Sequence, residues 1–163
     1  MKKQILIGIF AFCLLMTINA CKKEGPAGAA GKDGNANVKS STVTVTNWSF
    51  SSPSYYTDIS WGVLTTDMVN NGAVFVYAST GTNTWSQLPL TIYPSSNYSS
   101  TLEVVTSPGN VRIIWTDSDL TQPANPGQFT FKIVAIAASQ RLANPDVDYT
   151  NYNEVKARYN LEE

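Results

Sequence analysis

The segment 129–137 contains the longest alternation of apolar side chains in the sequence, and this feature constrains the fold most. Side chains of a β-strand point alternately to the two faces of a sheet, so residues two apart share a face. One face of this strand is formed by Phe129, Phe131, Ile133, Ala135 and Ala137. Val134 and Ile136 make the other face apolar as well, which predicts a strand whose far end is covered on both sides.

Six further segments have the composition or the period of a β-strand, and turn residues separate them. They are residues 38–50, 55–63, 73–79, 84–93, 98–106 and 111–115. Short strands at fairly regular spacing, joined by polar turns, are typical of two packed antiparallel sheets. We therefore expect a mainly β fold of about seven strands, an immunoglobulin-like or jelly-roll-like antiparallel β-sandwich. A β-barrel is the alternative.

Two of the expected strands carry an irregularity. In 38–50 the apolar residues change parity, which predicts a bulge or a bend near Thr46 and Asn47, because one face of a strand cannot change parity otherwise. In 84–93, Pro89 has no N–H group to donate to a neighbouring strand. That strand should therefore lie at a sheet edge or carry a bulge.

Two short helical segments are expected. Thr65 or Thr66 can cap a helical turn that ends at Gly72, where glycine suits a left-handed terminus; an Asn71-Gly72 hairpin is the alternative. Near the end of the sequence, Asn151 and Glu154 have the spacing of a capping box. The apolar residues that follow fall on one helical face: Tyr152, Val155 and Tyr159. A short helix over 151–161 should therefore pack on the β-domain.

The first residues have the pattern of a secretion signal. Lys2 and Lys3 precede an apolar run over 5–16, and small residues then precede Cys21. The apolar run is shorter than the roughly 20 residues that a membrane-spanning helix needs. The segment 18–21, Ile-Asn-Ala-Cys, resembles the lipobox of bacterial lipoproteins, whose cysteine is acylated before the signal is removed. That resemblance implies a signal peptide at 1–20 and a lipid on Cys21. The alternative is an ordinary signal peptide that is cleaved elsewhere.

Residues 25–36 are four triplets that each begin with glycine, which is the period of collagen. Four triplets are few for a triple helix. We expect residues 21–37 to be a hydrophilic tether between the lipid and a β-domain at 38–163, and the protein to be a monomer. A homotrimer built through residues 25–36 is the alternative.

Composition excludes several kinds of chemistry. The sequence has no histidine, which removes Ser-His-Asp and Cys-His catalysis. Its cysteines are Cys13, in the expected signal, and Cys21, so the expected β-domain has no thiol and no disulfide. Without Lys2 and Lys3, nine cationic residues face twelve acidic ones, a formal charge of about −3. No basic patch suggests a nucleic-acid partner, and no cofactor is expected.

Longer stretches of the sequence carry a family resemblance. They are Cys-Lys-Lys-Glu at 21–24 with the glycine triplets after it, Asn-Asn-Gly-Ala-Val at 70–74, and Asn-Tyr-Asn-Glu-Val-Lys at 151–156. Together they resemble an uncharacterised family of Bacteroidota lipoproteins with a short collagen-like segment after the lipobox. The resemblance implies a lipoprotein with a β-rich domain, and it supplies no catalytic or binding residues.

Carboxylates form the first set of candidate site residues. Asp117 and Asp119 flank Ser118, and Asp146 and Asp148 flank Val147. Such pairs of oxygen ligands on loops suit calcium, whereas aspartates in turns more often accept hydrogen bonds from nearby backbone amides. We favour turn capping and expect no metal site. Glu103, the one glutamate in the strand region, should lie on a solvated face, so a two-carboxylate glycosidase is the least favoured function.

Aromatic residues form the second set. Trp85 follows a Gly-Asn turn and precedes Tyr93 and Tyr98, which makes it the best candidate for an exposed aromatic that contacts a ligand. We therefore expect no catalytic residues and a non-enzymatic lipoprotein of the outer membrane, facing the periplasm or the cell surface, that serves as a structural or binding module. The alternative is a surface module that binds carbohydrate or mediates adhesion, with a glycan or an envelope protein as partner.

Overall fold

The computed structural model describes residues 37–161. The expected signal, Cys21 and the glycine triplets lie outside the described residues, so these predictions and the trimer that depends on residues 25–36 stay predictions. Within 37–161 the strands are β1 (Val38–Val45), β2 (Ser49–Ser51), β3 (Ser54–Ser60), β4 (Ala73–Gly81), β5 (Thr84–Gln87), β6 (Leu90–Ile92), β7 (Ser100–Ser107), β8 (Asn110–Asp117) and β9 (Phe129–Ile136). The helices are α2 (Thr66–Asn71), α3 (Ala138–Ala143) and α4 (Tyr152–Tyr159).

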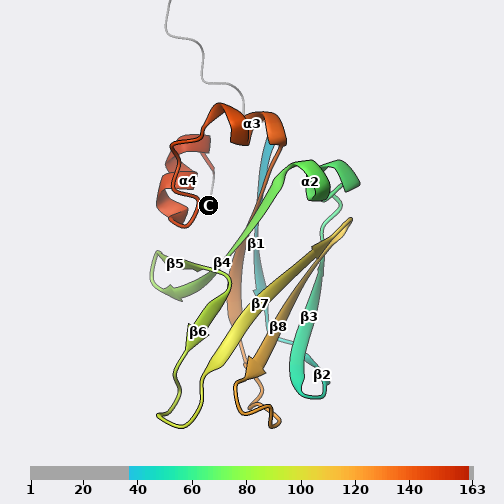
Figure 1. The fold of residues 1–163 in the computed structure, drawn as a ribbon, viewed down its shortest axis with the longest axis vertical. Coiled ribbons are helices and arrows are strands. Elements are labelled where there is room, and N and C mark those ends of the chain that lie inside the picture. The colour runs from blue at the N-terminus through green and yellow to red at the C-terminus, as the bar shows by residue number, and fades with distance from the viewer. Residues whose placement is uncertain (1–36, 162–163) are drawn as a thin grey trace, which may run out of the picture. The chain divides into compact units, whose positions relative to one another are not determined.

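The strands form two antiparallel sheets that pack face to face (Figure 1). One sheet has four strands in the order β1-β9-β4-β5, and the other has five in the order β2-β3-β8-β7-β6. The expected antiparallel β-sandwich is confirmed, and within the described part of the chain the sheets do not close into a barrel. None of the helices in this part of the chain has the length and apolar character needed to cross a membrane.

Two expected strands are each divided into two, which raises the expected seven strands to nine. The segment 38–50 becomes β1 and β2, and the segment 84–93 becomes β5 and β6. Each division moves the chain from an edge of the four-stranded sheet to an edge of the five-stranded sheet. The parity change near Thr46 and the missing N–H of Pro89 thus mark crossings between sheets. The edge position expected for the segment with Pro89 is confirmed, because β5 and β6 each lie at the edge of a sheet.

The main core fills the space between the sheets. The alternating residues of β8 and β9 meet there, together with residues of β3, β4 and β7, as the period of two predicts. The fully enclosed side chains of this core include Val76, Leu102, Val111, Ile113, Phe131 and Ile133. This core fixes which face of each strand points outward, and hence which side chains are available to solvent.

A second core lies on the outer face of the four-stranded sheet, under α4. Val134 and Ile136 of β9 contact the helix residues there, which confirms that the end of this strand is covered on both faces. The helix contributes the residues expected from its spacing: Tyr152, Val155 and Tyr159, all buried. The short helix α3 was not expected, since its sequence lacks a capping side chain and buries none of its own residues.

The helical turn at Thr65 is confirmed, because its side chain accepts a hydrogen bond from the N–H of Met68, 3.2 Å away, and α2 follows. The reason given for Gly72 was wrong: its φ is −87°, outside the left-handed region. A Cβ at Gly72 would lie 2.6 Å from the carbonyl oxygen of Ile136 and 2.7 Å from that of Met68. Glycine is needed here for close backbone approach.

Candidate binding surface

Three loops gather at the end of the sandwich opposite Asn37. Asn37 accepts a hydrogen bond from the N–H of Ala137, just after β9, so the described chain begins at the α3 end (Figure 1). β1 runs from there to the other end, where Val45 pairs with Phe129. The loop before β7 and the loop after β8 lie at the same end, since Ser100, the first residue of β7, pairs with Asp117, the last residue of β8. We call this set the distal loops: residues 46–53, 93–99 and 118–128.

Hydrogen bonds join the distal loops to one another. The N–H of Ser118 donates to the carbonyl of Ser99 at 2.8 Å, and the N–H of Ser99 donates to Oγ of Ser118 at 3.0 Å. On the other side, Nε1 of Trp48 donates to the carbonyl of Gly127 at 2.8 Å. These bonds hold the three loops in one arrangement before any partner binds, which lowers the entropy that binding costs.

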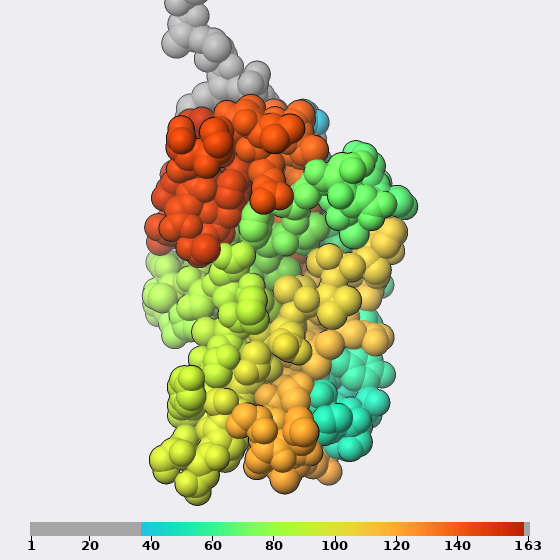
Figure 2. Space-filling view, in the orientation of Figure 1, coloured from blue at the N-terminus to red at the C-terminus, as the bar shows by residue number. Residues whose placement is uncertain are grey.

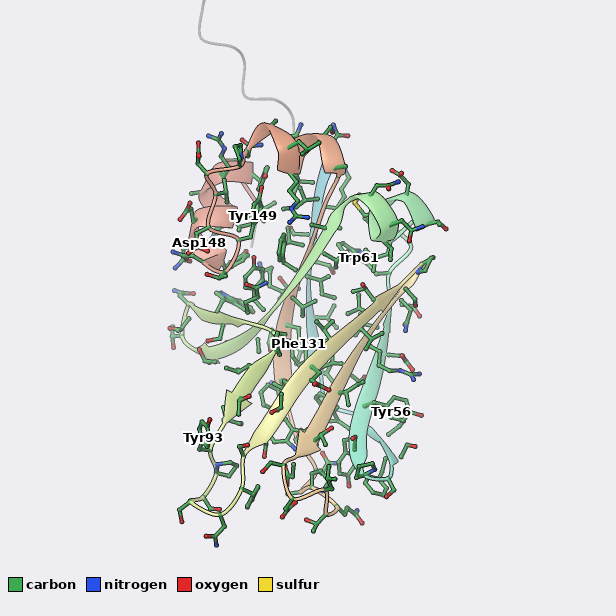
Figure 3. All side chains as sticks on the ribbon, viewed as in Figure 1. Tyr56, Trp61, Tyr93, Phe131, Asp148 and Tyr149 are labelled. Carbon is green, nitrogen blue, oxygen red and sulfur yellow. The ribbon has the colours of Figure 1, made fainter. Side chains whose placement is uncertain are left out.

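The distal loops carry three of the large apolar side chains that are well exposed in the described part of the chain. Tyr93 is 78% exposed, Leu120 is 67% exposed and Phe50, in the short strand β2, is 42% exposed. Figure 3 shows Tyr93 at the margin of the molecule, just past β6. Tyr98, in the same loop, is half-buried. Tyr93 and Tyr98 therefore flank one loop, and Tyr93 is the aromatic ring offered to solvent.

Leu120 has a left-handed backbone, with φ of +56°. A branched side chain in this region costs roughly 1–2 kcal/mol, and glycine or asparagine is the usual occupant. Asn83 and Asn160 occupy the same region at φ of 56° and 49°. At position 120 the sequence thus has an exposed leucine where glycine or asparagine would adopt the same backbone conformation at a lower cost.

The expectation that Trp85 is an exposed aromatic was wrong. Trp85 is half-buried on the outer face of the four-stranded sheet, where its ring lies 5.5 Å from the ring of Tyr152 in α4. Nζ of Lys132 lies 5.5 Å from the Trp85 ring and 5.3 Å from the Tyr152 ring, within the range of a cation–π interaction. Trp85 is thus part of the second core and is not joined with Tyr93 and Tyr98.

The first carboxylate pair is divided between two environments. Asp117 is buried at the end of β8 and accepts a hydrogen bond from Oγ of Ser100 at 2.6 Å. Asp119 is exposed and accepts from both the N–H and the hydroxyl of Thr121, at 3.0 and 2.9 Å. Both carboxylates thus bond within the fold, as the turn-capping interpretation expects of Asp119.

The second carboxylate pair lies in the connection to α4. Asp148 accepts from the N–H and the hydroxyl of Thr150, at 2.9 and 2.6 Å, and these hydrogen bonds lower the pKa of its carboxyl group. Asp146 is exposed. Within residues 37–161, acidic side chains nowhere gather in the groups of three that a metal ion would need. The bonds of Asp119 and Asp148, each to a threonine two residues later, are those of turn capping.

A polar network on the open face of the five-stranded sheet was missed. The carboxylate of Asp58 accepts from Nε and Nη2 of Arg112, at 2.8 and 2.7 Å, and from Nδ2 of Asn110 at 2.9 Å. These bonds lower the pKa of Asp58 to about 2, with the bond from Arg112 as the largest cause. The guanidinium also lies 4.6 Å from the ring centre of Tyr56.

This face of the five-stranded sheet is open to solvent. Figure 2 shows that no helix crosses β7 and β8 on this side. Glu103 of β7 is exposed here, as expected.

The buried lysine was missed as well, although the sequence carries a signal for it. Lys132 is only 3% exposed and stands inside the apolar run of β9. Beside it, the hydroxyl of Tyr77 donates to the carbonyl of Tyr149 at 2.7 Å, and the hydroxyls of Tyr149 and Tyr159 lie 2.9 Å apart. These hydrogen bonds tie α4 and the segment before it to the sheet, so we assign these groups to the structure of the domain.

Comparison of the chain with protein-family models, with characterised proteins and with solved structures found no match.

Proposed function

We propose that this chain is a lipoprotein of the outer membrane, anchored through a lipid on Cys21, that acts as a non-enzymatic binding module. The lipobox-like segment before Cys21 and the glycine triplets after it support the anchor and the tether. The distal loops are the binding surface. The membrane itself is the first partner of this protein, through the lipid.

The observation that carries this proposal is the position of the distal loops relative to Asn37. The tether joins the sandwich at its α3 end, whereas the distal loops lie at the other end. A partner that approaches from solution meets the end farthest from the point of attachment. A rigid sandwich that presents loops at one end is a recurrent way of building a binding site.

The chemical character of the loops agrees with binding rather than catalysis. They are rich in Ser, Asn and Tyr, the residues that antibody loops use because rigid rings and adaptable polar groups bind without long flexible side chains. The carboxylates that reach this end, Asp117 and Asp119, each accept hydrogen bonds from neighbouring residues. The loops thus offer contact area and hydrogen bonds.

Protease treatment of intact cells tests the anchor and the display of the domain. Wild-type protein should stay with the membrane fraction and lose its β-domain to external protease. The Cys21→Ser variant should leave the membrane fraction, since it cannot be acylated. Recovery of Cys21→Ser in the membrane fraction at the wild-type level would contradict the anchor.

The same experiment decides on which side of the outer membrane the domain lies. A domain that resists external protease until the outer membrane is permeabilised faces the periplasm, and its partner is then an envelope component. A periplasmic protein without a signal-derived anchor serves as the permeability control.

A further inference from the structure

The inference concerns the partner of the distal loops and rests on the function proposed above. The loop residues include no lysine, arginine or histidine. Among the acidic residues, Asp117 is buried against Ser100, and Asp119 accepts two hydrogen bonds from Thr121. The cations and the other carboxylates of the described domain lie on other elements, such as the Asp58–Arg112 pair of the open sheet face. The distal loops thus carry no cation, and their exposed charge is the carboxylate of Asp119.

An anionic partner would find no cation at this end and would be repelled by the carboxylate of Asp119. A cationic partner would find this single carboxylate, which already accepts two hydrogen bonds from Thr121. The charges therefore disfavour an anionic partner, and a neutral partner meets no repulsion. The groups that the loops do offer are hydroxyls and amides, such as Ser95, Ser96 and Asn97, beside the exposed aromatic rings of Tyr93 and Phe50. Neutral sugars match this combination, because a pyranose has an apolar C–H face and a rim of hydroxyl groups.

Tyr93 is placed to contact such a face. Its ring is 78% exposed, and it stands directly after β6, whose pairing with β7 fixes the backbone at that point. In the loop that follows, the N–H of Asn97 donates to Oγ of Ser95 at 3.2 Å. At the end of this loop, Ser99 is bonded to Ser118 of the neighbouring loop. A ring on a fixed support loses little entropy when a flat ligand stacks on it.

We infer that the distal loops bind an uncharged polysaccharide, with Tyr93 as the residue on which a sugar ring stacks. A protein partner is the main competitor, because the distal loops also expose Leu120, and an exposed leucine is a typical contact for an apolar pocket on a protein. A surface that binds only a protein should not bind a neutral polysaccharide.

The test uses the full-length lipidated protein, purified in a detergent without a sugar headgroup and applied to an array of neutral glucans, xylans, mannans and galactans. Polygalacturonate and chondroitin sulfate serve as anionic probes. At least one neutral polymer should bind, and the anionic ones should not. Tyr93→Ala should weaken this binding by about tenfold or more, whereas Tyr93→Phe keeps the ring and should stay within about twofold.

Leu142→Asn, which replaces an exposed leucine of α3 outside the distal loops, is the control variant and should bind within about twofold of wild type. Thermal unfolding of each variant shows that the domain is intact. The inference is overturned if no neutral polymer binds, if an anionic polymer binds better, or if Tyr93→Ala binds as wild type does. Equal losses in Tyr93→Ala and Leu142→Asn would also overturn it, because binding would then not depend on the distal loops. The anchor is tested separately by Cys21→Ser, so either idea can fail alone.

Discussion

The carboxylate of Asp58 and the guanidinium of Arg112 face each other across β3 and β8 through two parallel hydrogen bonds, at 2.8 and 2.7 Å. This bidentate geometry is stronger than a single contact, but both side chains are more than one-third exposed, so solvent screens the pair. We therefore expect the pair to hold the side chains of Asp58 and Arg112 in one arrangement on the open sheet face and to add little to the free energy of unfolding.

The pH dependence of stability should report this pair. The pKa of Asp58 is about 2 in the folded protein and near 3.8 ordinarily, so the folded state holds its proton less tightly than the unfolded chain does. The stabilisation is fully present above the ordinary pKa and is lost as the pH falls through 2. Asp58→Asn should lower Tm by about 2 °C at neutral pH and should have almost no effect well below pH 2. Glu103→Gln, on the same face, is the control; an equal pH profile for the two variants would refute the assignment.

Gly72 should not tolerate a larger residue. In Gly72→Ala the new Cβ would meet two backbone oxygens, of Ile136 and Met68, and neither can move without disturbing β9 or α2. We expect a loss of about 2–3 kcal/mol in the free energy of unfolding. Gly62→Ala, whose Cβ would have no atom within 4 Å, should stay within about 0.5 kcal/mol of wild type. Urea unfolding followed by circular dichroism measures the stability of both variants. Similar midpoints would show that the backbone at position 72 can move away from the carbonyl oxygens of Ile136 and Met68.

Much of the sandwich could be predicted from the sequence, because alternation records which side chains face a core. The alternation does not predict that the segments 38–50 and 84–93 cross between sheets, since a period of two identifies a strand but not the strand with which it pairs. Trp85 shows the same limit for the site. Its exposure depends on Tyr152 of α4, a helix that follows all the strands, and no local pattern around Trp85 carries that contact. The bond of Asp58 to Arg112 likewise requires the register of β3 with β8.

High pH should destabilise the protein through Tyr77. Burial raises the pKa of its hydroxyl above the ordinary value of 10, with smaller contributions from Tyr152, Asp148 and Tyr149. The unfolded chain then releases the proton at a lower pH than the folded protein does, so stability is retained below pH 10 and falls as the pH rises above it. Tyr77→Phe should cost about 1 kcal/mol at neutral pH through the lost hydrogen bond to Tyr149.

The same variant should also reduce the alkaline loss of stability, as seen by unfolding at several pH values. The exposed Tyr93→Phe is the control and should leave the alkaline profile as it is in wild type. If Tyr77→Phe and wild type lose stability in parallel above pH 10, Tyr77 is not the group responsible.

The docking of α4 should depend on Val155. This side chain is fully buried between the helix and the sheet. Val155→Ala leaves a cavity and should lower the free energy of unfolding by about 2 kcal/mol, whereas Ala157→Ser, on the exposed side of the same helix, should change it by less than about 0.5 kcal/mol. Hydrogen exchange of the α4 amides checks the mechanism: faster exchange in Val155→Ala but not in Ala157→Ser is expected, and unchanged exchange would show that the helix is held by other contacts.

Leu120→Asn should stabilise the protein, because it removes the cost of a branched residue at positive φ. A gain of about 0.5–1 kcal/mol in the free energy of unfolding is expected. Leu142→Asn, which replaces another exposed leucine, that of α3, provides the control and should give no gain. A loss of stability in Leu120→Asn would mean that the leucine side chain contributes to the fold.

The course of β1 has a mechanical consequence. This strand begins next to Asn37, pairs with β9 over all eight of its residues, and ends where the distal loops begin. A pull between the attachment end and a partner held at the loops acts along the strand, parallel to its axis and across its hydrogen bonds. The load is then shared by the whole β1–β9 ladder in shear, instead of opening its pairs one after another from an end. A module that has to hold its partner under tension would gain from this course of its first strand.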